Sequence, residues 1–256
     1  MPVPRTLPRT IKEFWQLTRS VIAAASHRVP EKLAVLQQAD LPTVQRILIQ
    51  YRWFAAYSAG DLAILIAKLP ASELRSKLAV CLDDELGRGN PDDSRIAQYD
   101  RFLIGLGVTP DDIEYQVDPE ILALLELHRT RMHGATYLYG IGLEAMGAEC
   151  LCHVYLQAMR HHLLENPVVQ QASLDWTFWD HTCEADHGGK TRAAIERVAE
   201  TGDTRELARG YLDAEERWRR FWDIAHAAGT EQRPGLSEEA ELPSDGWRYR
   251  PAPDES

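Results

Sequence analysis

The sequence predicts an all-α protein, a bundle of roughly seven or more helices. Apolar residues recur at intervals of three and four, as on one face of a helix, for example Ile47, Tyr51 and Phe54. No segment shows the alternation of apolar and polar residues that a half-buried strand requires. Short stretches rich in proline, glycine and aspartate separate the helical patterns, as expected between antiparallel neighbours. No internal repeat is found.

Capping residues and prolines predict where each helix begins. The expected helix starts are Thr10 (with Glu13 as a capping box), Pro30, Pro42, Asp61, Ser72, Asn90, Asp118, Asn166, and Asp203 or Thr204. Glycines predict three helix ends, at Gly60, at Gly87 with Gly89, and at Gly107.

Residues 121–164 keep a helical pattern, with a break expected near residues 132–134. The middle of this segment is rich in small residues: Gly134, Ala135, Gly140, Gly142, Gly147 and Ala148. Glycine costs about 1 kcal/mol against alanine inside a helix. Several together therefore predict either close helix packing or space for a ligand, and the sequence favours neither.

Composition limits the classes of function. Hydrophobic residues make up 45% and charged residues 26% of the 256 positions, which is typical of a soluble globular protein. The net charge of −11 argues against a nucleic-acid partner. No apolar stretch is long enough for a secretory signal or a membrane span, so a cytoplasmic protein is expected. Its four cysteines are too irregularly spaced for a disulfide framework.

The chain is expected to hold one large domain between two tails. Residues 1–8 form a flexible N-terminal tail, residues 9–228 the helical bundle, and residues 229–256 an acidic, mobile C-terminal tail.

Ligand-type side chains are concentrated between residues 178 and 189. On a continuous helix Asp180, Glu184 and His187 would fall within roughly 60° of one another, because a helix turns about 100° per residue. His181 could join this face by leaning toward it. Such a half-buried acidic face needs a positive partner, and a divalent metal would supply one. The alternative is a solvated or salt-bridged helix face.

Two more stretches carry ligand-type residues. Glu85 ends a helix, where a carboxylate meets the negative end of the helix dipole and needs a nearby cation. Glu149 and His153 stand four residues apart in an otherwise apolar helix. Taken singly, each residue is more often salt-bridged than metal-bound.

In this order the three stretches resemble the haem-oxygenase-like di-iron oxidases and oxygenases, a family of iron-containing redox enzymes. The segment Asp84–Pro91 is similar to the family's Asp-Glu-Leu-Gly-x-Gly-Asp/Asn-Pro motif. Glu149 is placed like the glutamate of a later helix. Asp180, Glu184 and His187 keep the spacing of its last motif, His-x-x-x-Asp-x-x-His. The resemblance covers roughly residues 45 to 200.

The resemblance implies a haem-oxygenase-like bundle, Fe(II) at two ions per chain, O₂ as co-substrate and a homodimer. It also implies oxidation of a small amine or amino-acid-like substrate, in natural-product biosynthesis. The implied metal ligands are Glu85, Glu149, Asp180, Glu184 and His187, with His181, His153 and Asp61 as further ones. Arg95 would bind a substrate carboxylate, and Tyr137 and Tyr155 would line the cavity.

Three positions depart from the family. Arg95 stands where the family has a histidine, and Asp180 and Glu184 replace a histidine and an aspartate. Three outcomes therefore stay open: a two-metal site, a single metal held by a subset such as Glu149, Glu184 and His187, or no metal. In the last case Arg95 would neutralise the carboxylates.

The main alternative keeps the fold without iron. A metal-free relative, thiaminase-like or quinone-synthase-like, would bind or transform a small aromatic molecule, with the same acids as proton shuttles and Cys183 as a nucleophile. A ferritin-like di-iron bundle ranks lower, because only one Glu-x-x-His motif is present. A purely interacting role has only the acidic tail in its favour.

Overall fold

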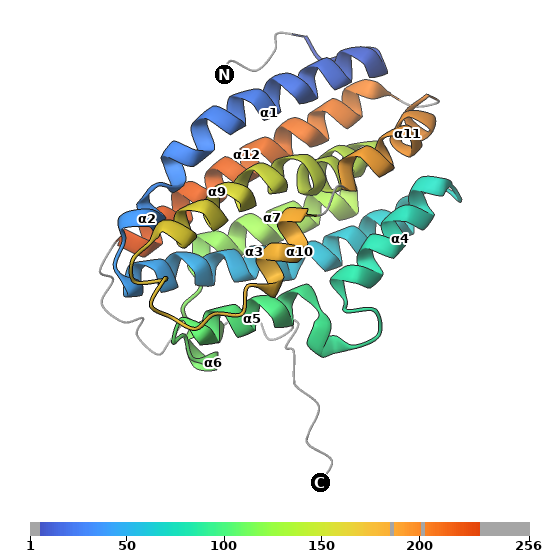
Figure 1. Cartoon of the computed structure of the whole chain (residues 1–256). Coiled ribbons are helices and arrows are strands. Elements are labelled where there is room, and N and C mark those ends of the chain that lie inside the picture. The colour runs from blue at the N-terminus through green and yellow to red at the C-terminus, as the bar shows by residue number, and fades with distance from the viewer. Residues whose placement is uncertain (1–5, 185–186, 201–202, 231–256) are drawn as a thin grey trace.

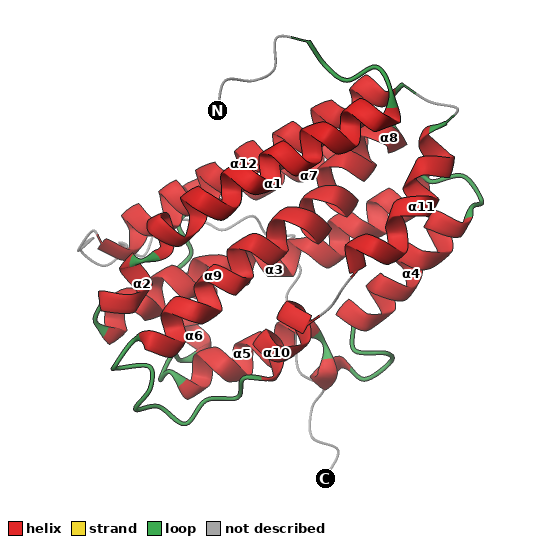
Figure 2. Ribbon diagram, turned by 45° about the horizontal axis from the view of Figure 1, so that its top comes forward, coloured by secondary structure: helices red, strands yellow, loops and turns green. Residues whose placement is uncertain are grey.

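The structure, a computed structural model, describes residues 6–184, 187–200 and 203–230, and its regular elements there are all helical. Figure 1 shows the long helices side by side in one bundle, with α1 next to both α9 and α12. Figure 2 shows helices and loops in the same residues.

The elements are α1 (Ile11–Leu33), α2 (Val35–Gln38), α3 (Leu41–Lys68), α4 (Glu73–Glu85), η1 (Pro91–Asp93), α5 (Arg95–Gly105), α6 (Pro110–Tyr115), α7 (Pro119–Gly134), α8 (Tyr137–Gly140), η2 (Ile141–Leu151), α9 (Cys152–Glu165), α10 (Thr177–Glu184), α11 (His187–Ala199) and α12 (Thr204–Thr230). The all-α prediction is confirmed.

Most predicted helix starts are correct, and the caps explain why. The capping box of Thr10 with Glu13 forms as expected, Ser72 caps α4 and Asp118 caps α7. Each side chain accepts a hydrogen bond from a backbone N–H that the first turn of a helix leaves unpaired. Local capping signals are therefore a reliable part of this sequence.

The two boundaries predicted within residues 41–68 are wrong, because tertiary contacts outweigh the local signal. Gly60 does not end a helix, and Asp61 does not cap one, because α3 runs through both. A Cβ at Gly60 would lie 2.9 Å from the Arg129 guanidinium, so the glycine makes room for that group. The Asp61 carboxylate pairs with Arg129 (Nε–Oδ1 2.9 Å) and is buried instead of capping a backbone.

Pro30 lies inside α1 and does not begin a second helix there. A proline removes a helical hydrogen bond at a cost of about 3 kcal/mol. The packing of α1 on α9 and α12 offsets that cost, since Ala25, Val29 and Leu33 are buried on this face. His162 of α9 also contacts the Pro30 carbonyl oxygen (Nε2–O 2.8 Å).

The short helix expected after Asn166 is a series of turns, and the ligand-rich stretch is two helices. Helix α10 ends at Glu184 and α11 begins at His187, with α10 packed on α9 and α5, and α11 on α4 and η2. The shared face expected for Asp180, Glu184 and His187 spans residues 185–186, which lie outside the described residues.

Small residues bring η2 and α12 into direct backbone contact. A Cβ at Gly142 would lie 2.0 Å from the Leu207 carbonyl oxygen, and one at Gly210 would lie 2.0 Å from that of Tyr139. A Cβ at Gly147 would meet the Ala214 methyl at 2.5 Å. Of the two explanations left open for these glycines, close helix packing is confirmed. The same element η2 is a π-helix, a form that is rare and often lies at functional sites.

One residue of each predicted tail packs against the bundle. Pro8 is buried, and Gly229 belongs to α12, with its carbonyl oxygen accepting a hydrogen bond from Arg46 (Nη2–O 2.6 Å). The remainder of both predicted tails, residues 1–5 and 231–256, lies outside the described residues. None of the helices described combines the length and apolar character that a membrane crossing requires.

Candidate ligand cavity

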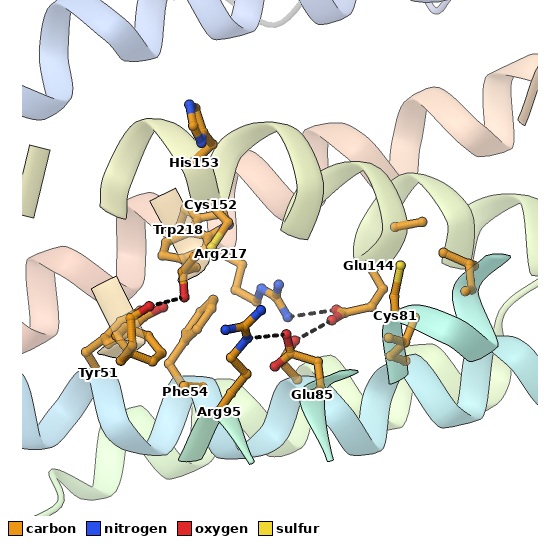
Figure 3. Close-up of a pocket in the computed structure, with 17 residues that line it drawn as sticks. Tyr51, Phe54, Cys81, Glu85, Arg95, Glu144, Cys152, His153, Arg217 and Trp218 are labelled. Atoms are coloured by element: carbon orange, nitrogen blue, oxygen red, sulfur yellow. Dashed lines mark hydrogen bonds and ion pairs between the residues drawn. The ribbon is translucent and has the colours of Figure 1, made fainter. Parts of the chain in front are cut away.

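A cavity of about 140 Å³ lies inside the bundle, between α3, α4, α5, η2, α9, α10 and α12. Aromatic rings form much of its wall, from Tyr51, Phe54, Phe178 and Trp218. These rings belong to a packed aromatic core, in which Phe54 and Trp218 have centroids 4.3 Å apart. Figure 3 shows charged side chains beside these aromatic rings, namely Glu85, Arg95, Glu144 and Arg217.

Glu85 and Arg95 reach the cavity because the chain turns sharply between them. Glu85 is the last residue of α4, and Gly87 and Gly89 have φ of 85° and 86°. A Cβ at Gly87 would lie 2.1 Å from the Asn90 carbonyl oxygen, so this turn requires glycine. Ser94 then caps α5, whose first residue is Arg95. The turn sets Arg95 Nε 3.4 Å from Glu85 Oε1, a loosely paired carboxylate and guanidinium.

The Glu85 carboxylate faces the cavity and not the outer surface. It lies deep among protein atoms, and yet its side chain keeps 34% of its accessible surface. Both hold because the side chain lines an internal space. This burial raises the pKa of Glu85 above its usual value, and the positive charge of Arg95 lowers it part of the way back.

A second polar group lies next to the cavity and is fully buried. Glu144 of η2 is 1% exposed and His128 of α7 is 3% exposed, with Nε2–Oε2 3.2 Å. Arg217 of α12 lies between them, its Nη1 2.5 Å from His128 Nε2 and 3.5 Å from Glu144 Oε2. The Asp61 carboxylate approaches the same ring nitrogen of His128 (Nε2–Oδ2 3.6 Å). We call Asp61, His128, Glu144, Arg217 and Arg129 the buried charge cluster.

Burial is the main cause of every pKa shift in this cluster. It raises the pKa of Glu144 and of Asp61, and the proximity of the two carboxylates raises that of Asp61 further. It lowers the pKa of His128 well below the usual range, and the positive charge of Arg217 adds to this effect. The imidazole is therefore neutral at pH 7, and its Nε2 accepts a hydrogen bond from Arg217.

The buried charge cluster contains the one group of metal-type ligands found among the described residues, Asp61, His128 and Glu144. Their ligand atoms lie within 4.8 Å of one another, and Asp61 Oδ2 has no hydrogen-bond partner. Two guanidinium groups nevertheless balance the two carboxylates already. A dication about 4 Å from one guanidinium would be repelled by about 8 kcal/mol at an effective dielectric of about 20. The residues present do not fit an iron centre.

The structure does not bring the predicted iron ligands together within its described residues. Glu85 lines the cavity, but Asp180 pairs with Arg160 (Nη2–Oδ1 2.7 Å), and its side chain is 49% exposed. The side chains of Cys183, Glu184 and His187 lie outside the described residues, as does that of Glu149. Asp180 is thus a salt-bridged surface residue, which is the alternative the sequence left open for it.

The three further ligands also lie apart. His181 is exposed, and its Nδ1 lies 3.3 Å from the amide oxygen of Gln98. His153 lines the cavity, but Figure 3 shows its ring turned away from Glu85 and Glu144. Asp61 belongs to the buried charge cluster, where Arg129 and His128 contact its carboxylate.

Of the predicted substrate-binding residues, only Arg95 lines the cavity. Tyr137 begins α8, packs at the edge of the core, and is not among the cavity residues. Tyr155 is buried behind the wall, with its ring stacked on Trp218 at 4.7 Å between centroids. Tyr155 therefore supports the cavity without lining it.

Sequence reasoning missed Glu144, His128 and Arg217. Glu144 carries a usable signal, since it is the only charged residue in the apolar run from Ile141 to Ala148. A lone carboxylate in such a run is buried and needs a partner. No local signal marks His128 and Arg217, because their apolar neighbours are those of any amphipathic helix.

No protein-family model and no curated protein matches this sequence. Solved structures do match, and they define the class of protein: the chain has the all-α, haem-oxygenase-like fold of the TenA proteins. A CADD-like protein of unknown function from Nostoc punctiforme PCC 73102 has a TM-score of 0.69 at 16% identity, over 88% of this chain and 100% of that one. A TenA homologue protein from P. horikoshii OT3 has 0.63 at 14%, over 84% and 99%. A TenA family transcription regulator from Silicibacter sp. TM1040 has 0.51 at 14%, over 83% and 96%.

Identities this low establish the fold and nothing finer. The expected membership in the di-iron oxidases is wrong, because the structural neighbours are CADD-like and TenA-family proteins. The segment Asp84–Pro91 that suggested it has a structural explanation. Its glycines take the positive φ values of the turn that joins α4 to η1 and α5.

Proposed function

We propose that this protein binds a small aromatic molecule in its internal cavity, without a metal. The observation that carries the proposal is the combination of aromatic walls with the pair of Glu85 and Arg95, both of which line the cavity. Ligand sites are mostly apolar cavities with a few polar groups that fix orientation. The cavity volume of about 140 Å³ suits one ring, since an engineered protein cavity of about 150 Å³ binds benzene.

Arginine in place of a metal supports the metal-free part of the proposal. Each acid described near the cavity has a guanidinium beside it, with Arg95 next to Glu85, Arg217 next to Glu144 and Arg129 next to Asp61. Buried carboxylates need a positive partner, and arginine supplies the same charge compensation that a cation would. The predicted Fe(II), O₂ chemistry and homodimer stay predictions.

The test is binding of single-ring probes, followed by amide chemical shifts, with a cavity-filling variant. Ala55→Phe places a ring into the cavity from α3, and Ala63→Phe makes the same change at an exposed position of the same helix. We expect toluene to bind the wild type and Ala63→Phe but not Ala55→Phe. Equal binding to all three, or to none, would disprove the cavity as the ligand site.

Anaerobic Fe(II) titration tests the metal-free part separately. We expect no stoichiometric uptake by the wild type, because a dication would have to displace Arg217 or Arg129 from the carboxylates. Uptake of one or two irons per chain, lost in Glu144→Gln, would refute this part of the proposal.

The raised pKa of Glu85 supports a second function, acid-base catalysis on the bound molecule. A carboxyl group whose pKa is shifted toward neutrality, and which faces a cavity, is suited to give and take a proton. In that case Glu85→Gln would abolish turnover and leave the binding of toluene, which has no polar group, within a few fold of the wild type.

A further inference from the structure

The charged end of the cavity presents a hydrogen-bond acceptor beside a donor. Glu85 Oε1 and Arg95 Nε are 3.4 Å apart, too far for a strong bond, so each group keeps most of its bonding capacity. Within the described part of the chain, Arg95 makes no other hydrogen bond or ion pair. Its two terminal nitrogens therefore still have donors to offer.

The other charged groups at the cavity are already engaged. Glu144 receives hydrogen bonds from Ser58 (Oγ–Oε1 3.1 Å) and Arg217. The Arg217 guanidinium contacts His128 and Glu144, and it lies over the Phe54 ring at 4.7 Å from the centroid. A ligand in the cavity can therefore meet these groups only by displacing existing partners. Glu85 and Arg95 can form hydrogen bonds with the polar edge of a ligand without losing another partner.

We infer that the ligand is a planar ring compound with a hydrogen-bond donor and an acceptor side by side on one edge, as in a primary carboxamide or a lactam. Its N–H would donate to Glu85, and its carbonyl oxygen would accept from Arg95. This inference rests on the proposed binding of a small aromatic molecule, and it adds the chemical class of that molecule.

Charge complementarity excludes the two simpler edges. A ligand carboxylate would pair with Arg95 and place a negative charge against Glu85. An amidinium would pair with Glu85 and place a positive charge against Arg95. A neutral edge with one donor and one acceptor satisfies both groups, and a group left unpaired in a cavity loses affinity.

Four probes of nearly equal size test the inference: benzamide, benzoate, benzamidine and toluene. Binding to the wild type is measured by titration of amide chemical shifts at pH 7.5. We expect benzamide to bind at least tenfold more tightly than each of the other three. Tighter or equal binding of benzoate or benzamidine would overturn the inference.

The binding of toluene distinguishes failure of this inference from failure of the proposed function. If toluene and benzamide bind equally well, the cavity holds aromatic rings but the donor and acceptor edge is wrong. If no probe binds, the proposed function fails, and the inference fails with it.

Two variants should exchange the preference. Glu85→Gln replaces an acceptor with an amide that can donate, so benzoate should become the best probe. Arg95→Met removes the donors and leaves the carboxylate, so benzamidine should become the best probe. Glu73→Gln on α4 and Arg101→Met on α5 are exposed matched controls, and both should keep the wild-type order. If Glu85→Gln and Arg95→Met keep the wild-type order of probe affinities, the inference is refuted. If either variant does not fold, the comparison of the four probes on the wild type decides the inference.

Discussion

Removal of the Arg217 guanidinium should strongly destabilise the protein, because it leaves Glu144 buried without a positive partner. The two groups are 3.5 Å apart, and their side chains are 7% and 2% exposed. At an effective dielectric of about 20 their attraction is about 5 kcal/mol. Breaking a buried ion pair by removing one partner typically costs about 3–5 kcal/mol. We therefore expect Arg217→Met to lower the free energy of unfolding by about 3–5 kcal/mol at pH 8.

The loss should depend on pH in a defined direction. Burial already raises the pKa of Glu144, and the charge of Arg217 lowers it part of the way back, so its removal raises that pKa further. A carboxyl group with a raised pKa in the folded state destabilises the fold above its unfolded pKa, about 4.3. The penalty disappears as the pH falls below that value. The difference between variant and wild type should thus be larger at pH 8 than at pH 5.5.

Urea unfolding at both pH values measures this effect, with Arg209→Met as the control. Arg209 lies on the same helix and makes an exposed ion pair with Glu206, so its loss should cost less than about 1 kcal/mol at either pH. A double-mutant cycle of Arg217→Met and Glu144→Gln should give a coupling energy above about 1 kcal/mol for this pair. If Arg217→Met costs no more than Arg209→Met, the buried charge cluster does not stabilise the fold as argued.

Three more perturbations follow from the same contacts. Gly142→Ala should lower the free energy of unfolding in urea by more than about 3 kcal/mol, because its methyl group would meet the backbone of α12. Gly134→Ala, which has open space around it, is the control and should change that free energy by about 1 kcal/mol or less. Arg95→Met should raise the pKa of Glu85 further in a carbon-13 NMR titration of its carboxyl group, and an unchanged or lower pKa would contradict the ion pair. Asp180→Asn should cost less than about 1 kcal/mol and leave probe binding unaltered, as a half-exposed salt bridge requires. A loss of toluene binding in Asp180→Asn would show that Asp180 contributes to the ligand site.

The expectation that three iron ligands share one helical face rested on one geometric assumption. It treated residues 180–187 as one helix, so that three ligand-type side chains would share a face. Helices α10 and α11 pack on different neighbours, and the Asp180 carboxylate pairs with the Arg160 guanidinium of α9. The spacing of ligand-type residues predicts a site only when the helix beneath them is continuous.

The sequence by itself determined the fold class and the turn at the cavity. Apolar periodicity, the caps at Thr10, Ser72 and Asp118, and the glycines at 87 and 89 are local properties of the chain. Each acts within a few residues, where backbone geometry and a single hydrogen bond decide the conformation. They also placed Glu85 and Arg95 ten residues apart on either side of one turn, which is why their neighbourhood was predictable.

Only the tertiary structure decided which charges meet. Asp61, His128, Glu144 and Arg217 come from four different elements, and no local pattern relates them. The same packing kept α3 continuous through Gly60, because Arg129 occupies the space beside it. Burying a carboxylate requires a positive partner, but the sequence does not say whether that partner is a metal or a distant arginine. In this protein the partners are arginines: Arg217 of α12 lies beside Glu144 of η2, and Arg129 of α7 lies beside Asp61 of α3.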